Sequence, residues 1–272
     1  MTASTINDAR VASDSARFSP IAGLGALLRK DTTEWIRGRR AAVVFVIATL
    51  FMALTAANGW ITARIAENLP PDVVPPAVGS LDPLQNVMAA VSGQIFVLAT
   101  ILAASSLIVA EREAGTLAWV ASKPVSRGSI WLSKWISATG ILAIAAGLAP
   151  LAITVGLVGI LYGMPPIAAV VGLGIGIVAV VAYFAAVLLL AGTLLPGQAA
   201  VAATGFGVLM LTPVLPALVP FDVAPLLPTT MLAWPAMALS GEEVSIVTPL
   251  AWAIVTGALG IIAVRRMTRV EL

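Results

Sequence analysis

Residues 87–127 read VMAAVSGQIFVLATILAASSLIVAEREAGTLAWVASKPVSR, an apolar run followed by a charged one. Its first part, residues 87–110, contains no Asp, Glu, Lys or Arg, and Glu111, Arg112 and Glu113 then follow in a row. An α-helix needs about 20 apolar residues to cross the hydrocarbon core of a bilayer. The stretch therefore predicts a membrane-spanning helix that leaves the bilayer at Glu111.

The composition extends this prediction to the whole chain. Of its 272 residues, 60% are hydrophobic and 10% are charged, and the mean hydropathy is +1.03. A water-soluble domain of this length could not bury so much apolar surface. We therefore expect an all-α polytopic membrane protein with six transmembrane helices in a single domain, residues 21–272. The six predicted spans are residues 41–62, 87–110, 135–161, 167–195, 198–219 and 247–264.

The basic residues indicate how the spans are oriented. Cytoplasmic loops carry an excess of Lys and Arg. The N-terminal region, the segment 111–134 and the C-terminus hold all of the 15 Lys and Arg residues except Arg64. This distribution predicts that both termini and the segment 111–134 lie in the cytoplasm. It also explains the basic pI of about 9.4 through topology, so nucleic-acid binding is not implied.

The N-terminal region divides into two parts. Residues 1–20 are polar and lack periodicity, so we expect a mobile cytoplasmic tail. Residues 21–40 place Leu24, Leu28 and Trp35 near one helical face and end in several Arg residues. We therefore predict a basic amphipathic helix that lies in the inner headgroup layer. The alternative is an ordinary positively charged stop before the first span.

The segment 111–134 is dense in charged and turn-forming residues and separates two apolar runs. Gly115 permits a break after the second span. Residues 116–121 can form a short helix across the membrane face, and Pro124 ends it. Ser126 is suited to cap the helix that leads into the third span. A helical pair with a transverse helix at its tip could transmit a push from outside the membrane.

Two simpler interpretations of this segment are open. It could be an ordinary helical hairpin loop that carries the positive charges of the cytoplasmic side. Glu111 and Arg112 could also form a local ion pair at the end of the span instead of contacting a partner protein directly.

The chain lacks the residues of common catalytic and metal-binding sites. It contains no Cys and no His, and no Walker A, HExxH or GxSxG pattern occurs. We therefore expect no catalytic, cofactor-binding or metal-binding residue on this chain. The spans also lack ionisable residues, which carriers coupled to protons or ions usually keep. Sodium sites built from backbone carbonyls would escape this argument.

Neutral polar residues in the second span are candidates for a transport pathway. Gln94, Leu98, Ile101 and Ser105 share one face by helical spacing. They could line a pathway for a substrate. Hydrogen bonding between helices is the alternative role for each polar member of the group.

The charged segment resembles that of a known family. Glu111-Arg112-Glu113-x-Gly115-Thr116-Leu117, then Pro124-x-Ser126-Arg127 and Lys134, is similar to the segment between the second and third spans of the ABC type-2 permeases. These are the membrane subunits of ATP-binding-cassette exporters. A basic amphipathic entry helix, six spans and a Pro-broken apolar stretch before the last span agree with this family. The resemblance therefore covers residues 21–272.

The resemblance implies an ABCG-like exporter transmembrane domain that is driven by a separate ATPase. The segment 111–134 would be the coupling loop, and two copies of an ABC ATPase subunit would bind ATP and Mg, with no cofactor on this chain. A second permease copy, in a homodimer or a heterodimer, would complete the substrate path. The residues that the match assigns to ATPase coupling are Glu111, Arg112, Glu113, Gly115, Thr116 and Leu117.

We expect a permease subunit of an ATP-driven exporter in a bacterial cytoplasmic (inner) membrane. The uncharged spans favour a hydrophobic or amphipathic substrate such as a drug, an antibiotic or a lipid. Two alternatives belong to other functional classes. One is an ATPase-independent secondary carrier or channel, and the other is a membrane scaffold that recruits a cytoplasmic partner through the segment 111–134.

Overall fold

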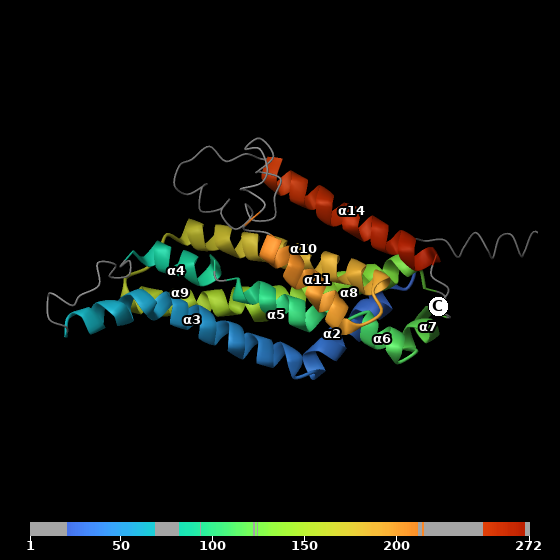
Figure 1. Cartoon of the computed structure of the whole chain (residues 1–272), viewed down its shortest axis with the longest axis horizontal. Coiled ribbons are helices and arrows are strands. Elements are labelled where there is room, and N and C mark those ends of the chain that lie inside the picture. The colour runs from blue at the N-terminus through green and yellow to red at the C-terminus, as the bar shows by residue number, and fades with distance from the viewer. Residues whose placement is uncertain are drawn as a thin grey trace, which may run out of the picture.

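The structure is an elongated bundle of helices. It is a computed structural model that describes residues 21–68, 82–92, 94–121, 123, 125–211, 214 and 247–269. Helices and turns make up these residues, with no strand among them, and Figure 1 shows most helices running along the long axis. The predicted tail, residues 1–20, lies outside the described residues. The elements in chain order are α2 (Leu24–Arg37), α3 (Arg40–Ala66), α4 (Pro83–Ser92), α5 (Ile95–Ala104), α6 (Val109–Glu113), α7 (Thr116–Ala121), α8 (Arg127–Leu142), η1 (Ala143–Leu148), α9 (Ala149–Leu161), α10 (Ile167–Leu194), α11 (Gln198–Leu211) and α14 (Val247–Arg269).

Five helical stretches in the described part of the chain are long and apolar enough to cross a membrane. They correspond to five of the six predicted spans and confirm the class of all-α multi-pass membrane protein. For the predicted span 198–219, the described helix is α11 with 14 residues, and most of residues 212–219 lie outside the described part. The five stretches are Arg40–Ala66, Pro83–Glu113, Arg127–Leu161, Ile167–Leu194 and Val247–Met267.

The second span, predicted as one helix over residues 87–110, is divided into α4, α5 and α6. Its first break is at Gln94, whose φ of 54° lies in the left-handed region that residues other than Gly seldom adopt. Its second break covers residues 105–108, which form turns. There the Ser105 hydroxyl donates to the carbonyl of Leu102 at 3.2 Å, and such a bond competes with the helical ladder. An uninterrupted apolar run does not reveal these breaks.

The helix that contains the predicted span 135–161 begins at Arg127, directly after its predicted cap Ser126, and continues to Leu161. Its middle part, η1, is a π-helical segment. Pro150, the second residue of the following helix α9, lacks the amide hydrogen that a regular helix needs, so a wider turn before it accommodates the missing hydrogen bond. η1 packs closely against α10. A side chain at Gly147 would collide with Ile177 of α10.

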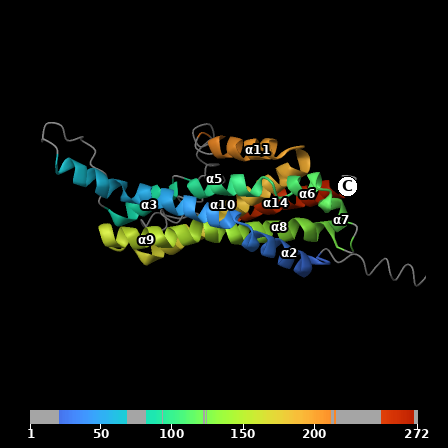
Figure 2. The same ribbon diagram turned by 90° about the horizontal axis from the view of Figure 1, so that it is seen from below.

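α2 packs against the bundle along one stripe of its surface. Leu27, Asp31 and Trp35 are buried, and their spacing of four residues places them on one face. This face lies along α8, as Figure 2 shows. A helix therefore forms within the predicted residues 21–40 and packs Leu27 and Trp35 on protein, whereas Leu24 and Leu28 of the predicted apolar face are only partly buried. Its position in the headgroup layer stays a prediction.

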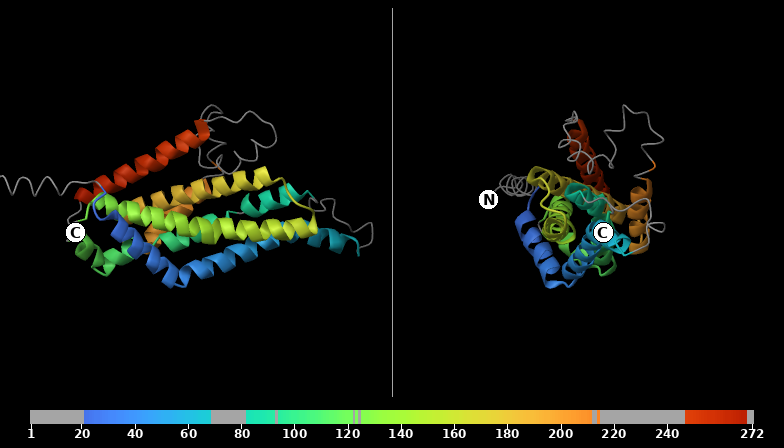
Figure 3. Two further views of the ribbon diagram at one scale, coloured as in Figure 1. Left: turned by 180° about the vertical axis from the view of Figure 1, so that it is seen from behind. Right: turned by 90° about the vertical axis from the view of Figure 1, so that its left-hand side faces the viewer.

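α10 lies at the centre of the bundle, whereas α3 and α14 lie at its edges. α10 contacts α5, α8, α11 and α14. α3 and α14 instead expose apolar side chains along much of their length, which suits contact with lipid chains. Figure 3 shows α14 diverging from the other helices toward its N-terminal end.

Substitution of two glycines of α11 tests how this helix packs against α5 and α10. A Cβ atom at Gly205 would lie 2.9 Å from Leu188 Cδ2 and 3.0 Å from two side-chain atoms of Ile101, whereas one at Gly207 would meet nothing within 4 Å. Gly205→Leu should therefore lower the free energy of unfolding by about 1–3 kcal/mol. The control Gly207→Leu should preserve or slightly raise it, because Leu favours a helix more than Gly. Thermal unfolding in detergent measures both, and equal effects would contradict this packing.

Candidate functional site

The charged segment forms a short helix at one end of the bundle, beside the C-terminal end of α14 (Figure 1). After α6 the chain breaks at Gly115, whose φ of 70° is a conformation that Gly adopts easily, and α7 then begins. The Thr116 hydroxyl donates to the carbonyl of Glu111 at 3.1 Å and ties the two helices together. The predicted break at Gly115 and the predicted helix over residues 116–121 are confirmed.

The second half of the segment is tied to three other helices. Ser126 caps α8 as predicted, because its hydroxyl accepts a hydrogen bond from the amide of Ser129 at 3.0 Å. The Ser126 amide donates to the carbonyl of Ala22, just before α2, at 3.2 Å. The Arg127 guanidinium donates to the carbonyl of Met267 near the end of α14. The return of the chain from α7 is thus held against α2, α8 and α14.

Glu111 lies between two lysine side chains from other helices. Its Oε1 accepts a hydrogen bond from Lys30 Nζ of α2 at 2.7 Å, and its Oε2 is 2.8 Å from Lys134 Nζ of α8. The side chains of Glu111 and Lys134 are only 15% and 6% exposed. An ionised side chain in such a place needs a close partner, because an unpaired buried charge is strongly destabilising.

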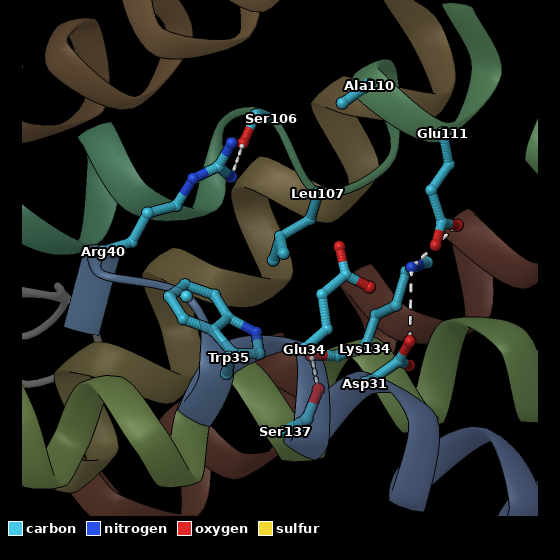
Figure 4. A pocket seen from close by; sticks show the side chains of 11 residues that line it. Asp31, Glu34, Trp35, Arg40, Ser106, Leu107, Ala110, Glu111, Lys134 and Ser137 are labelled. Carbon is cyan, nitrogen blue, oxygen red and sulfur yellow. Dashed lines mark hydrogen bonds and ion pairs between the residues drawn. The ribbon is translucent and has the colours of Figure 1, made fainter. Parts of the chain in front are cut away.

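Asp31 of α2 completes the group, and Figure 4 shows it converging with Glu111 on Lys134. It accepts a hydrogen bond from Ser133 Oγ at 2.8 Å, and its Oδ1 is 3.8 Å from Lys134 Nζ. We call Lys30, Asp31, Glu111 and Lys134 the charge cluster. Burial alone would lower the pKa of Lys30, but the hydrogen bond and negative charge of Glu111 outweigh it and hold the pKa above its ordinary value. Lys30 is therefore charged at neutral pH.

Arg112 points to a different helix. Its guanidinium donates to the carbonyls of Gly192 at 3.2 Å and Leu195 at 2.6 Å, at the C-terminal end of α10. The last carbonyls of a helix lack partners within it and carry partial negative charge, so Arg112 caps α10. Glu111 and Arg112 do not pair with each other, which contradicts the local ion pair considered from the sequence. Each fixes the segment to a different part of the bundle.

A cavity of about 260 Å³ adjoins the charge cluster near the bend from α2 to α3 (Figure 4). On one side of it, the Arg40 guanidinium donates to Ser106 Oγ at 3.1 Å. Carboxylate oxygens of Asp31, Glu34 and Glu111 lie within 4.8 Å of one another, a spacing that a cation could bridge. Lys30 and Lys134 pair with Asp31 and Glu111 and so offset two of these three negative charges. We therefore describe the charge cluster as an ion-pair network.

The remaining predicted coupling residues lie at the tip of the segment. Glu113, Gly115 and Thr116 are exposed, and Leu117 belongs to α7. The sequence analysis did not single out Trp119, which is 64% exposed and has Lys123 Nζ 4.6 Å from its ring centroid. Its position could have identified Trp119 from the sequence, because it is a tryptophan within the short helix predicted between two spans.

Of the four candidate pathway residues, Leu98 and Ile101 lie on α5, Gln94 precedes it and Ser105 follows it. Gln94 is the left-handed N-cap of α5 and so does not continue the helical spacing of the others. Leu98 is half-buried, and Ile101 is fully buried on a helix that contacts α10 and α11. Ser105 Oγ accepts a hydrogen bond from Gln198 Nε2 of α11 at 3.4 Å, which is the kind of contact between helices considered as the alternative. A pathway-lining role stays a prediction.

Comparison with known proteins gives one family and two relatives. The family described as "ABC-2 family transporter protein" matches residues 25–255. The chain is 30% identical over 133 residues to the probable ABC transporter permease protein NosY of Stutzerimonas stutzeri, with 47% of this chain and 45% of that protein aligned. The protein of the same name from Pseudomonas aeruginosa is 31% identical over 131 residues, with 47% and 44% aligned. The chain thus spans less than half the length of each of these relatives.

Loss of one lysine tests whether the charge cluster holds the helices together. Lys134→Met leaves two buried carboxylates with one ammonium group and should lower the free energy of unfolding by about 3–5 kcal/mol. Lys123→Met, which removes an exposed lysine, is the control and should have a much smaller effect. Adding Glu111→Gln to Lys134→Met should recover part of the loss, because the charges balance again. Denaturant unfolding in detergent measures the three variants, and a Lys134→Met loss no larger than the control would contradict the role of the cluster.

Proposed function

The chain belongs to the ABC-2 family of transporter proteins, and from this premise we propose that it is the permease subunit of an ATP-driven exporter. It works with two copies of a separate ATPase subunit, which bind ATP and Mg. A second permease copy, identical or related, completes the translocation unit. The complex lies in a bacterial cytoplasmic membrane with both termini of this chain in the cytoplasm.

The observation that carries the proposal is the way in which α6 and α7 are held. The outer side of α7 presents Trp119 to solvent, whereas the base of the segment is fixed through Glu111 and Arg112. A docking element for an ATPase has to be accessible at its tip and rigid at its base. An ordinary hairpin loop would need neither property.

The contacts of the segment indicate which helices would move with it. Glu111 connects α6 to α2 and α8, Arg112 connects it to α10, and Arg127 connects the start of α8 to α14. A displacement of α7 by an ATPase would therefore carry the adjoining ends of these four helices together. Rigid-body movement of this kind is a common way for a bundle to alternate between two packings.

The distribution of charge supports both an external energy source and an apolar cargo. In the described spans, Asp, Glu, Lys and Arg occur only near the ends, so the middle of these spans offers no carboxylate to couple an ion gradient. The basic residues gather at the end of the bundle that carries α7, which favours a cytoplasmic location for that end. We propose a hydrophobic or amphipathic substrate, such as a drug, an antibiotic or a lipid.

Assembly with the ATPase can be tested at Trp119. Expressed with its ATPase partner and purified in mild detergent, the chain should bring down a subunit that contains a Walker A motif. Trp119→Ala should weaken the complex about tenfold or more, because a central interface Trp is often worth about 2 kcal/mol. The control Trp60→Ala removes a partly exposed Trp near the far end of α3 and should leave assembly unchanged.

Two results would contradict this proposal. The first is equal weakening by Trp119→Ala and Trp60→Ala, or stable isolation with no ATPase partner. The second is transport by this chain alone in liposomes, driven by an ion gradient, which would establish a secondary carrier instead.

A further inference from the structure

An apolar groove of about 940 Å³ runs along α14 and is lined on its other side by α8 and α10. On the α8 side, Trp131 and Trp135 stack with their ring centroids 5.7 Å apart and form a flat aromatic wall. Trp135 Nε1 donates to the carbonyl of Ala182 at 2.9 Å, which fixes this ring against α10. On the α14 side, a Cβ atom at Gly257 would meet nothing within 4 Å, whereas Gly260 lies close against the ring of Trp131. We call this space the α14 groove.

The α14 groove has a basic end and an apolar end. Arg265 lines it beside Gly128 at the end of the bundle that carries α7, and Trp252 and Pro249 line its other end. The rise along α14 from Trp252 to Arg265 is about 20 Å at 1.5 Å per residue. One leaflet contributes about 15 Å of hydrocarbon. The groove therefore runs from the membrane surface to about the middle of the bilayer.

A second apolar groove of about 600 Å³ adjoins the first. The two share Ile175, Ala179 and Ala182 of α10, and the second continues toward η1 and α9. Together they offer space for more than one hydrocarbon chain.

The lining and the volume of the α14 groove indicate which kind of molecule it binds. Between Arg265 and Trp252 the lining of the groove is mostly apolar, with Thr256 and the indole rings as exceptions, so it offers water few hydrogen-bond partners. Its volume lies near the top of the range of about 300–1,000 Å³ that is typical of small-molecule sites. A guanidinium at one end and indole rings along the wall match a molecule with an anionic head and hydrocarbon chains.

We propose that the α14 groove binds an anionic glycerophospholipid from the leaflet on the α7 side. Its phosphate lies at Arg265, and an acyl chain lies along Trp131 and Trp135. The lipid fills the space between α14 and the rest of the bundle and so connects this helix to α8 and α10. This site is separate from the charge cluster, and its occupancy does not depend on the direction of transport.

Tryptophan fluorescence tests the proposal, because bromine atoms on an acyl chain quench an indole that they touch. The full chain is placed in phosphatidylcholine nanodiscs, and brominated phosphatidylglycerol replaces a rising fraction of the lipid. We expect quenching that saturates at a few mole per cent. Gly257→Leu fills the groove at a position where a Cβ atom meets nothing within 4 Å, and it should abolish the saturable part. Arg265→Gln should shift saturation to a several-fold higher mole fraction.

Two further variants serve as a control and as a second groove-filling substitution. Ile254→Leu changes an exposed residue of α14 outside the groove and should behave as the wild type. Ala253→Leu fills the groove at a second position and should act as Gly257→Leu does if that variant folds poorly. Quenching that only follows mole fraction, or saturable quenching that both groove-filling variants retain, would overturn the proposal. Equal saturation by brominated phosphatidylcholine, or tighter binding of a brominated fatty acid, would overturn its choice of ligand.

Discussion

A carboxylate enclosed by helices has to be neutralised where it lies, and Glu111 meets this requirement with lysines from two other helices. Lys30 and Lys134 contact its two oxygens at 2.7 and 2.8 Å. Asp31 balances the second positive charge. Because removal of one member would leave a buried charge unpaired, the adjoining ends of α2, α6 and α8 are fixed relative to one another. The position of α7 follows from this constraint.

The polar contacts of the described residues that join distant helices are concentrated at the end of the bundle with α7. There the charge cluster holds α2 and α8, Arg112 caps α10, and Arg127 reaches α14. Farther along the bundle, apolar packing around α10 predominates, and the second span is broken at Gln94 and again at residues 105–108. Packed helices shift between discrete arrangements. A rigid end joined to a span with two breaks suits such a shift.

The sequence predicted the features that depend on local composition. Apolar runs gave five spans, Gly115 gave the break before α7, and Ser126 gave the cap of α8. It did not predict contacts between residues that are far apart in the sequence, such as the hydrogen bond of Lys30 with Glu111, 81 residues away. Asp31 on the apolar face of α2 is a signal that could have suggested a buried partner. The left-handed Gln94 is a backbone feature that hydropathy does not record.

Rigid connection of α2 to the segment of α6 and α7 is the central claim, and one distance tests it directly. The chain contains no Cys, so spin labels can be attached to single cysteines that replace the exposed residues Arg29 and Glu113. Pulsed electron paramagnetic resonance then measures their separation within one permease copy, with labelled chain diluted in unlabelled chain, in the complex with the ATPase with and without ATP. We expect one narrow distance that ATP does not change. A distance that shifts with ATP, or that is already broad in the resting complex, would contradict the claim.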